Sequence, residues 1–108
     1  MTKEIRLPSH RPPTTPGEML VIEFLEPLDM TVTAFAKHIG VPRDRLSEVI
    51  HGRRRVTPDT ALRLARALGT SAQFWLNAQQ ATDLYEALHS GHEKEIQRIK
   101  QVRMTATN

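Results

Sequence analysis

The stretch Ile39-Gly40-Val41-Pro42-Arg43-Asp44-Arg45-Leu46-Ser47-Glu48-Val49-Ile50 decides the fold of this 108-residue chain. One short apolar-periodic helix ends at Gly40, and a second begins near Arg43 with charges around Leu46 and Val49. Gly40 suits the turn because two sharply crossed helices usually need a left-handed backbone there, which glycine adopts at low cost. The stretch therefore predicts a helix-turn-helix, which presents its second helix to the major groove of DNA.

Positive charge is concentrated around this motif. Residues 37–66 hold eight of the 15 Lys and Arg residues but three of the 12 Asp and Glu residues, a net charge of +5 within a chain of +3. The segment His51-Gly52-Arg53-Arg54-Arg55 places three cations just beyond the second helix, where a phosphate backbone would lie. Charge runs also serve simply to solvate helices, but their coincidence with the motif favours nucleic-acid binding.

Start and stop signals divide the rest of the chain into helices. N-caps are expected at four helix starts: Thr15, Thr31, Thr57 and Ser71. We expect the first helix to stop before Pro27, with Leu20, Phe24 and Leu28 as its inward stripe. Five helices with short connections and no alternating strand pattern predict an all-α fold.

The domain organisation is expected to be simple. Residues 15–88 form one helix-turn-helix domain, preceded by a flexible, polar and proline-rich arm at 1–14. Residues 89–108 form a C-terminal tail. Within it, residues 92–103 either make a short charged helix or fray into solvent.

The composition argues against catalysis and cofactors. The absence of cysteine excludes disulfides and thiolate metal sites. His89 and His92 are spaced i, i+3, but Ser90 and Gly91 interrupt the helix between them. No nucleophile motif, phosphate-binding glycine loop or metal motif is visible, so we expect no enzyme, cofactor or metal. With no membrane-length apolar run and no signal peptide, the chain is expected to be cytoplasmic and without contact to a membrane.

The expected fifth helix, which starts after Ser71 and holds Phe74 to Leu88, carries apolar residues on more than one face. A helix that wide at the end of a small domain has two surfaces to bury, one on its own core and one elsewhere. A two-fold homodimer is the simplest solution. Its candidate interface residues are Phe74, Trp75, Ala78, Ala81, Tyr85 and Leu88, with Trp75 assigned either to this interface or to the core.

The first helix offers a different surface. Residues 12–36 contain four acidic residues and no Lys or Arg. Together with two apolar side chains they predict a site for a basic partner. The candidates are Glu18, Val21, Ile22, Glu23 and Glu26. In the alternative, Glu18 only serves the helix N-terminus and the other acids solvate the helix.

Five stretches resemble the lambda-repressor-like, or XRE, DNA-binding family, and more closely the HigA-type antitoxins, also labelled VapI-like. They are Pro16-Gly17-Glu18-Met19-Leu20, Phe24-Leu25-Glu26-Pro27-Leu28, Gly40-Val41-Pro42-Arg43, Thr60-Ala61-Leu62-Arg63-Leu64-Ala65 and Gly69-Thr70-Ser71-Ala72-Gln73-Phe74-Trp75-Leu76-Asn77. The resemblance covers roughly residues 14–88. It implies a homodimeric repressor that binds a palindrome in its own promoter and inhibits an mRNA-cleaving HigB-type toxin. The alternative is an XRE-family repressor with no cognate toxin.

The same resemblance places the start of the helix that begins near Arg43, the third of the five expected, in the major groove. The expected base-reading residues are Arg43, Asp44, Arg45, Ser47 and Glu48. Arg43 leads them because Arg can bond a guanine edge in bidentate fashion. Asp44 and Glu48 either accept from cytosine or orient neighbouring arginines. The expected phosphate contacts are Thr31, Thr33, Lys37, Arg53, Arg54 and Arg55.

Overall fold

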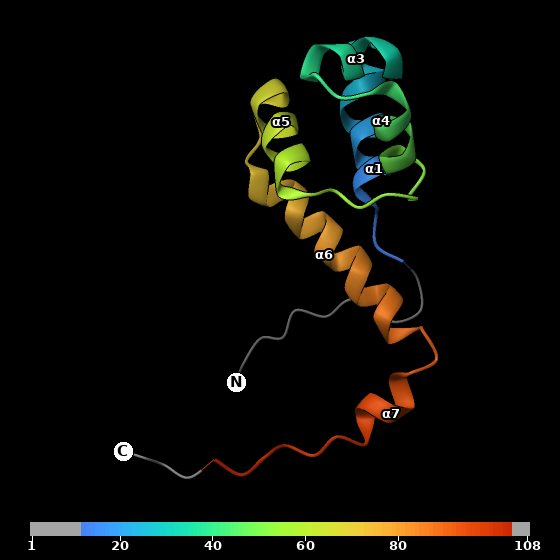
Figure 1. Cartoon of the computed structure of the whole chain (residues 1–108), viewed down its shortest axis with the longest axis vertical. Helices are drawn as coiled ribbons and strands as arrows, with labels where there is room; N and C mark the ends of the chain where they lie inside the picture. The colour runs from blue at the N-terminus through green and yellow to red at the C-terminus, as the bar shows by residue number, and fades with distance from the viewer. Residues whose placement is uncertain (1–11, 105–108) are drawn as a thin grey trace.

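The computed structural model describes residues 12–104, where all regular structure is helical (Figure 1). The elements are α1 (Pro16–Met19), the π-helix η1 (Leu20–Leu25), α2 (Glu26–Leu28), α3 (Val32–Ile39), α4 (Arg43–Ile50), α5 (Pro58–Leu68), α6 (Ala72–Leu88) and α7 (Glu93–Gln97). The first three are consecutive and make the first helix of the bundle, so the expected all-α fold is confirmed. Residues 1–11 of the expected arm and 105–108 of the tail lie outside the described residues.

The first helix has a different inward stripe from the expected one. It widens into π-helical geometry at Leu20–Leu25, where backbone hydrogen bonds span five residues instead of four. The buried positions, Leu20 and Leu25, are accordingly five residues apart. Phe24 is half-buried and Leu28 is 53% exposed, so the expectation that Leu28 faces inward is wrong.

The first helix also continues through Pro27 instead of stopping before it. The N–H of Glu26 still bonds to the carbonyl of Val21, five residues back. Where the helix changes from π-helical to α-helical hydrogen bonding, one carbonyl is left without an N–H donor whatever the residue. Proline lacks only that N–H, so Pro27 costs the helix little here. The helix ends at Asp29, which has a left-handed φ of 55°.

All four expected N-caps are confirmed. In each case the hydroxyl of the capping residue accepts a hydrogen bond from the N–H three residues later: Thr15, Thr31, Thr57 and Ser71. At α1 the cap is reciprocal, because the Glu18 carboxylate accepts from the N–H of Thr15 at 3.0 Å. Such caps stabilise a helix by about 1 kcal/mol each, so local chemistry sets these helix starts.

One core unites the helices of the bundle. Its buried apolar residues are Leu20, Leu25, Phe35, Ala36, Ile39, Val41, Leu46, Val49, Val56, Ala61, Leu64 and Trp75. The Trp75 ring lies 5.5 Å from the ring of Phe24 and 5.0 Å from that of Phe74, measured between centroids. Its indole N–H donates to the hydroxyl of Thr70 at 2.7 Å, so the largest core side chain keeps its polar atom satisfied.

The first helix contacts the end of α4 through the main chain. A Cβ atom on Gly17 would lie 2.3 Å from the carbonyl oxygen of Ile50 and 2.6 Å from that of Val49. Gly17 lies within α1, so the close approach of the two backbones, and not an unusual φ, requires glycine here. This contact fixes the position of the first helix relative to α4, the second helix of the helix-turn-helix.

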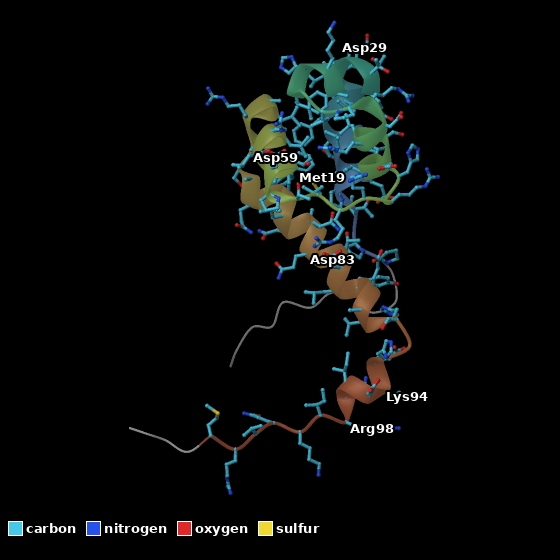
Figure 2. The ribbon with its side chains drawn as sticks, in the orientation of Figure 1. Met19, Asp29, Asp59, Asp83, Lys94 and Arg98 are labelled. Atoms are coloured by element: carbon cyan, nitrogen blue, oxygen red, sulfur yellow. The ribbon has the colours of Figure 1, made fainter. Side chains whose placement is uncertain are left out.

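The α6 helix extends beyond the bundle (Figure 1). It packs on α5 and α1, and beyond it α7 and the tail run away from the other helices. Among residues 89–104, regular structure beyond the end of α6 is limited to Glu93–Gln97, which is shorter than a helix over 92–103. Lys94 and Arg98 extend from this outlying segment (Figure 2). Within residues 12–104, no helix combines the length and apolarity needed to cross a membrane.

Candidate DNA-binding site

The turn between α3 and α4 is held from two sides. Gly40 has a left-handed φ of 76°, and the N–H of Val41 donates to the carbonyl of Ala36 at 3.0 Å. From α5, Arg63 donates to the carbonyl oxygens of Ile39 and Gly40 at 2.8 and 3.3 Å. Sequence alone marks Arg63 as one more cation, because a contact across 24 residues leaves no local signal.

The α4 helix turns one face to the core and the other to solvent. Leu46 and Val49 are buried, and Ile50 is half-buried. The expected base-reading residues lie outside this buried face: Arg43, Asp44 and Arg45 are exposed, and Ser47 and Glu48 are half-buried. The N-terminal turn of α4 thus offers donors and acceptors to another molecule.

Arg43 is oriented by neighbouring groups. Its Nε donates to Oγ1 of Thr33 on α3 at 3.0 Å, and its Nη1 lies 3.6 Å from Oδ1 of Asp44. The Arg43 side chain remains 59% exposed, so guanidinium N–H groups are left for a ligand. Thr33, expected only as a phosphate contact, therefore has a second role in holding Arg43.

Glu48 pairs with an arginine of the following loop. Its Oε1 accepts from Nε of Arg54 at 2.7 Å, and both side chains are about half exposed. An exposed pair of this kind adds at most about 1 kcal/mol to stability. Its effect is mainly to orient Arg54, which is the second of the two roles expected for Glu48.

A basic loop, residues 51–55, follows α4 and is exposed throughout. Gly52 has a φ of 76°, and the N–H of Arg53 donates to the carbonyl of Glu48 at 2.8 Å. This bonding pattern closes the end of α4 and keeps Arg53 and Arg54 beside it. Of the other expected phosphate contacts, Thr31 and Lys37 are exposed on or next to α3.

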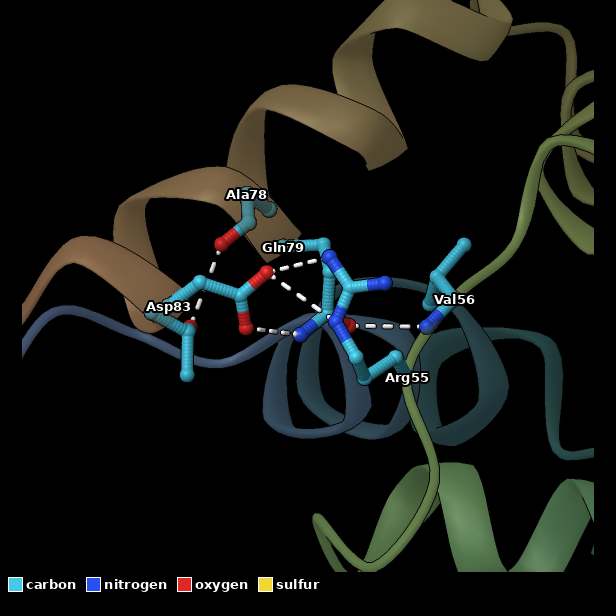
Figure 3. Close-up of polar contacts among 6 residues, drawn as sticks. Arg55, Val56, Ala78, Gln79 and Asp83 are labelled. Carbon is cyan, nitrogen blue, oxygen red and sulfur yellow. Dashed lines mark hydrogen bonds and ion pairs between the residues drawn. The ribbon is translucent and has the colours of Figure 1, made fainter. Parts of the chain in front are cut away.

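Arg55 is turned toward α6 (Figure 3). Its Nε and Nη2 both donate to Oδ2 of Asp83, the Nε at 3.1 Å. Oδ1 of Asp83 accepts from the Gln79 amide at 2.9 Å, and Oε1 of Gln79 accepts from the N–H of Val56 at 2.8 Å. The pKa of Asp83 lies below its ordinary value, chiefly because Arg55 donates to the carboxylate.

Gln79 and Asp83 were not among the residues expected from the sequence to form a site. The available signal was a polar pair at i, i+4 in a helix otherwise noted for apolar residues. Gln79 is only 7% exposed, and a side-chain amide buried to that extent must be hydrogen-bonded. Both residues link α6 to the basic loop.

The expected dimer-interface residues separate along α6. Trp75 is completely buried in its own core, which is one of the two places expected for it. Phe74 is partly exposed at the start of α6, far along the helix from the extending end. Ala78 is half-buried. The C-terminal half of α6 carries an apolar stripe at helical spacing, made of Ala81, Leu84, Tyr85 and Leu88. Leu84 was not among the expected interface residues.

The acidic surface of the first helix borders a groove. Of its expected members, Val21 is half-buried, and the others are exposed: Glu18, Ile22, Glu23 and Glu26. The groove has a volume of about 420 Å³. Its lining includes Met19, Ile22, Phe24 and Phe74 together with Glu18 and Glu23. An apolar floor and two carboxylates thus lie next to each other.

Known proteins match most of this chain. The helix-turn-helix family model HTH_3 matches residues 21–75. Antitoxin HigA-1 of Vibrio cholerae serotype O1 is 46% identical over 76 residues, which cover 70% of this chain and 71% of that protein. The uncharacterized HTH-type transcriptional regulator YbaQ of Escherichia coli strain K12 is 41% identical over 93 residues, 85% of this chain and 82% of that protein.

The fold leads to the same group. The structure of the Pseudomonas aeruginosa antitoxin HigA with the higBA promoter superposes with a TM-score of 0.78 and 32% identity, over 84% of this chain and 99% of that one. Such DNA-binding antitoxins are not enzymes, which confirms the expectation that this chain is none. The chain therefore belongs to the HTH_3 helix-turn-helix family and, within it, to the HigA-type antitoxins.

Proposed function

We propose that this protein is a sequence-specific DNA-binding antitoxin that represses its own operon as a homodimer and neutralises a HigB-type, mRNA-cleaving toxin. The observation that carries the DNA-binding part is the exposed N-terminal turn of α4, on which Thr33 holds Arg43. A related HigA antitoxin solved with promoter DNA supports it. Residues 15–88 form the proposed functional domain, with the arm before it and the tail after it.

The α4 helix reads bases and its surroundings contact phosphates. The proposed readers are Arg43, Asp44, Arg45, Ser47 and Glu48, with Arg43 donating to a guanine. The proposed backbone contacts are Thr31, Thr33, Lys37, Arg53 and Arg54, which fix the register of the protein on DNA. Because Thr33 and Asp44 already hold Arg43, less side-chain entropy is lost when it binds.

The extending half of α6 forms the proposed dimer surface. Its stripe of Ala81, Leu84, Tyr85 and Leu88 includes two leucines about half exposed, 49% for Leu84 and 46% for Leu88. A two-fold contact between two such stripes would bury both. The two α4 helices of the dimer would then meet half-sites about 34 Å apart, one helical turn of DNA.

The acidic surface of the first helix is the proposed toxin site. A protein that cleaves mRNA must hold a polyanion and so carries a basic surface, which carboxylates complement. The proposed contacts are Glu18, Val21, Ile22, Glu23 and Glu26, next to the groove. Ile22, 56% exposed, supplies the apolar centre that such interfaces use. The bond of Glu18 to the N–H of Thr15 leaves its helix-capping role intact alongside this one.

DNA binding is tested by fluorescence anisotropy. A labelled duplex from the region upstream of the gene is compared with a scrambled duplex of the same length at fixed salt. We expect the upstream duplex to bind at least about a thousandfold more tightly. Equal affinity for the two duplexes would overturn the proposal of sequence-specific binding.

Toxin neutralisation is tested by colony counts. The neighbouring small reading frame is induced with and without this chain, which is expressed from a promoter lacking its operator. We expect rescue by the wild type and by Glu86→Lys, an exposed acidic residue of α6, but not by Glu23→Lys. Toxicity that the wild type fails to relieve would favour the second candidate function, an XRE-family repressor with no cognate toxin.

A further inference from the structure

We propose that Gln79 and Asp83 are positioning residues for DNA recognition, and that Arg55 acts as a strut between the basic loop and α6 instead of as a phosphate contact. The inference rests on the proposed function, because it concerns how the DNA-binding loop is held. It assigns a role to a polar network that lies outside the base-reading helix (Figure 3).

The buried end of the loop depends on Gln79. The Val56 side chain is 1% exposed and anchors the chain in the core. Val56 lies outside the helices, so its N–H has no helical acceptor, and a buried N–H without a partner costs free energy. Oε1 of Gln79, from α6, accepts this N–H at 2.8 Å and so fixes where the loop leaves the core.

The other end of the loop is fixed by α4. The N–H of Arg53 donates to the carbonyl of Glu48 at 2.8 Å, so only Arg54 and Arg55 lie between two main-chain anchors. A segment this short has little freedom once both ends are bonded. The positions of its cations are therefore set jointly by the helix that reads DNA and by α6.

The two arginines between the anchors are bonded differently. Arg55 uses both Nε and Nη2 on Asp83, whose second oxygen is held by Gln79. Arg54 uses Nε alone on Glu48, which leaves its Nη groups for a phosphate. A phosphate that drew Arg55 away from α6 would break two hydrogen bonds to Asp83, whereas Arg54 has one to break. Arg54 is therefore the phosphate contact, and Arg55 links the basic loop to α6.

The hydrogen bonds from Gln79 and Asp83 to the loop affect specificity more than general affinity. The proposed dimer surface lies on the same helix as Gln79 and Asp83, so these bonds place each basic loop relative to the two-fold axis. Specific binding needs both α4 helices in register with two half-sites, whereas non-specific binding needs only positive charge near phosphate.

The test compares Asp83→Asn with Glu86→Gln in the full-length protein. Both changes remove one negative charge from α6, and both residues line the same hollow beside the loop, but among the described residues only Asp83 is seen to bind an arginine there. Anisotropy with the upstream and scrambled duplexes gives a specificity ratio. We expect Asp83→Asn to lower this ratio about threefold to tenfold and Glu86→Gln to leave it unchanged.

A second variant separates a strut from a phosphate contact. For Arg55→Gln we expect a lower specificity ratio but an unchanged slope of log affinity against log salt. Loss of a phosphate contact would reduce that slope by about 1. Because the Arg55 side chain is 65% exposed, this variant is expected to fold, and thermal melting followed by circular dichroism checks it.

The outcomes distinguish this inference from the proposed function. A wild type that binds both duplexes equally would overturn the proposed function and this inference with it. A specific wild type for which Asp83→Asn behaves like Glu86→Gln, or for which Arg55→Gln reduces the salt slope, would overturn the inference alone.

Discussion

Arg43, Arg54 and Arg55 are each hydrogen-bonded to a residue of another segment of the chain. The directions of Arg43 and Arg54 are therefore set before DNA arrives, which reduces the entropy lost on binding, and Arg55 is held on α6. The sequence predicted these arginines as a group, because clustered charge is visible in it. It could not identify partners such as Thr33 and Asp83, because these contacts join residues 10 and 28 positions apart.

Replacing Arg43 with Ala is expected to weaken binding to the upstream duplex by about 1–3 kcal/mol, because one base contact is lost. Binding to the scrambled duplex should stay close to the wild-type value. Arg54→Ala should weaken both and reduce the salt slope by about 1. Anisotropy over a series of salt concentrations measures both effects. Two variants that lost operator affinity alone, and to the same extent, would contradict these roles.

The ion pair between Arg55 and Asp83 predicts a pH dependence of stability. The pKa of Asp83 is lowered in the folded state, so its contribution is present above the ordinary carboxyl pKa and is lost as pH falls through the folded value. The difference in free energy of unfolding between the wild type and Asp83→Asn should be constant above about pH 5 and should shrink below about pH 4. Urea titrations across this range measure it. A difference that persists unchanged into acid would count against the ion pair.

At the scale of helices, starts were easier to predict than interiors. Caps at Thr15 and Thr57 follow from neighbours within three residues, and the structure confirms them. The π-helical segment of the first helix could not be predicted by a 3.6-residue pattern. It depends on how Leu20 and Leu25 reach the core, which tertiary packing decides. The correction to Leu28 follows from the same widening.

The widened helix predicts opposite effects at two leucines. Leu25→Ala should destabilise the protein by about 2–5 kcal/mol, because a buried side chain is lost from the core. Leu28→Ala, at a position 53% exposed, should change stability by no more than about 1 kcal/mol. Urea unfolding of both variants distinguishes the π-helical geometry of the first helix from an ordinary α-helical one. An ordinary α-helical stripe would produce the reverse order.

Gly17 offers a test of the contact between the first helix and α4. Helix propensity alone predicts that Gly17→Ala stabilises α1 by about 1 kcal/mol. We expect destabilisation instead, of about 1–3 kcal/mol, because the new Cβ meets the backbone of Ile50. Gly69→Ala is the control, because the φ of 75° strains an alanine there but no atom lies within 4 Å of the added Cβ. Thermal melts should show Gly17→Ala as the more damaging change.

For the whole molecule, the sequence predicted a helix-turn-helix at the centre and a broad final helix of the bundle. It could not show that α6 extends past the bundle, because apolar width does not reveal which half meets the core (Figure 1). Trp75 and Leu88 carry the same apolar signal, yet one is fully buried and the other 46% exposed. The packing of the first part of α6 on α5 and on the first helix separates them.

Dimerisation through α6 is expected to fail in Leu84→Lys. A charge at this half-exposed position would be buried without a partner in a two-fold contact, at a high cost. Leu62→Lys, on α5 and 62% exposed, is the matched control and should remain dimeric. Sedimentation equilibrium at micromolar concentration measures both. A monomeric wild type, or a dimeric Leu84→Lys, would exclude this surface as the interface.

The main-chain contact at Gly17 divides the first helix into one side that can drift over generations and one that cannot. Positions such as Glu23 and Glu26 are exposed, so substitutions there cost the fold little. Any side chain at position 17 must displace Ile50 and with it the end of α4. Substitutions on the exposed side can therefore remodel the proposed partner surface while α4 stays in place, whereas loss of this glycine requires a differently placed α4.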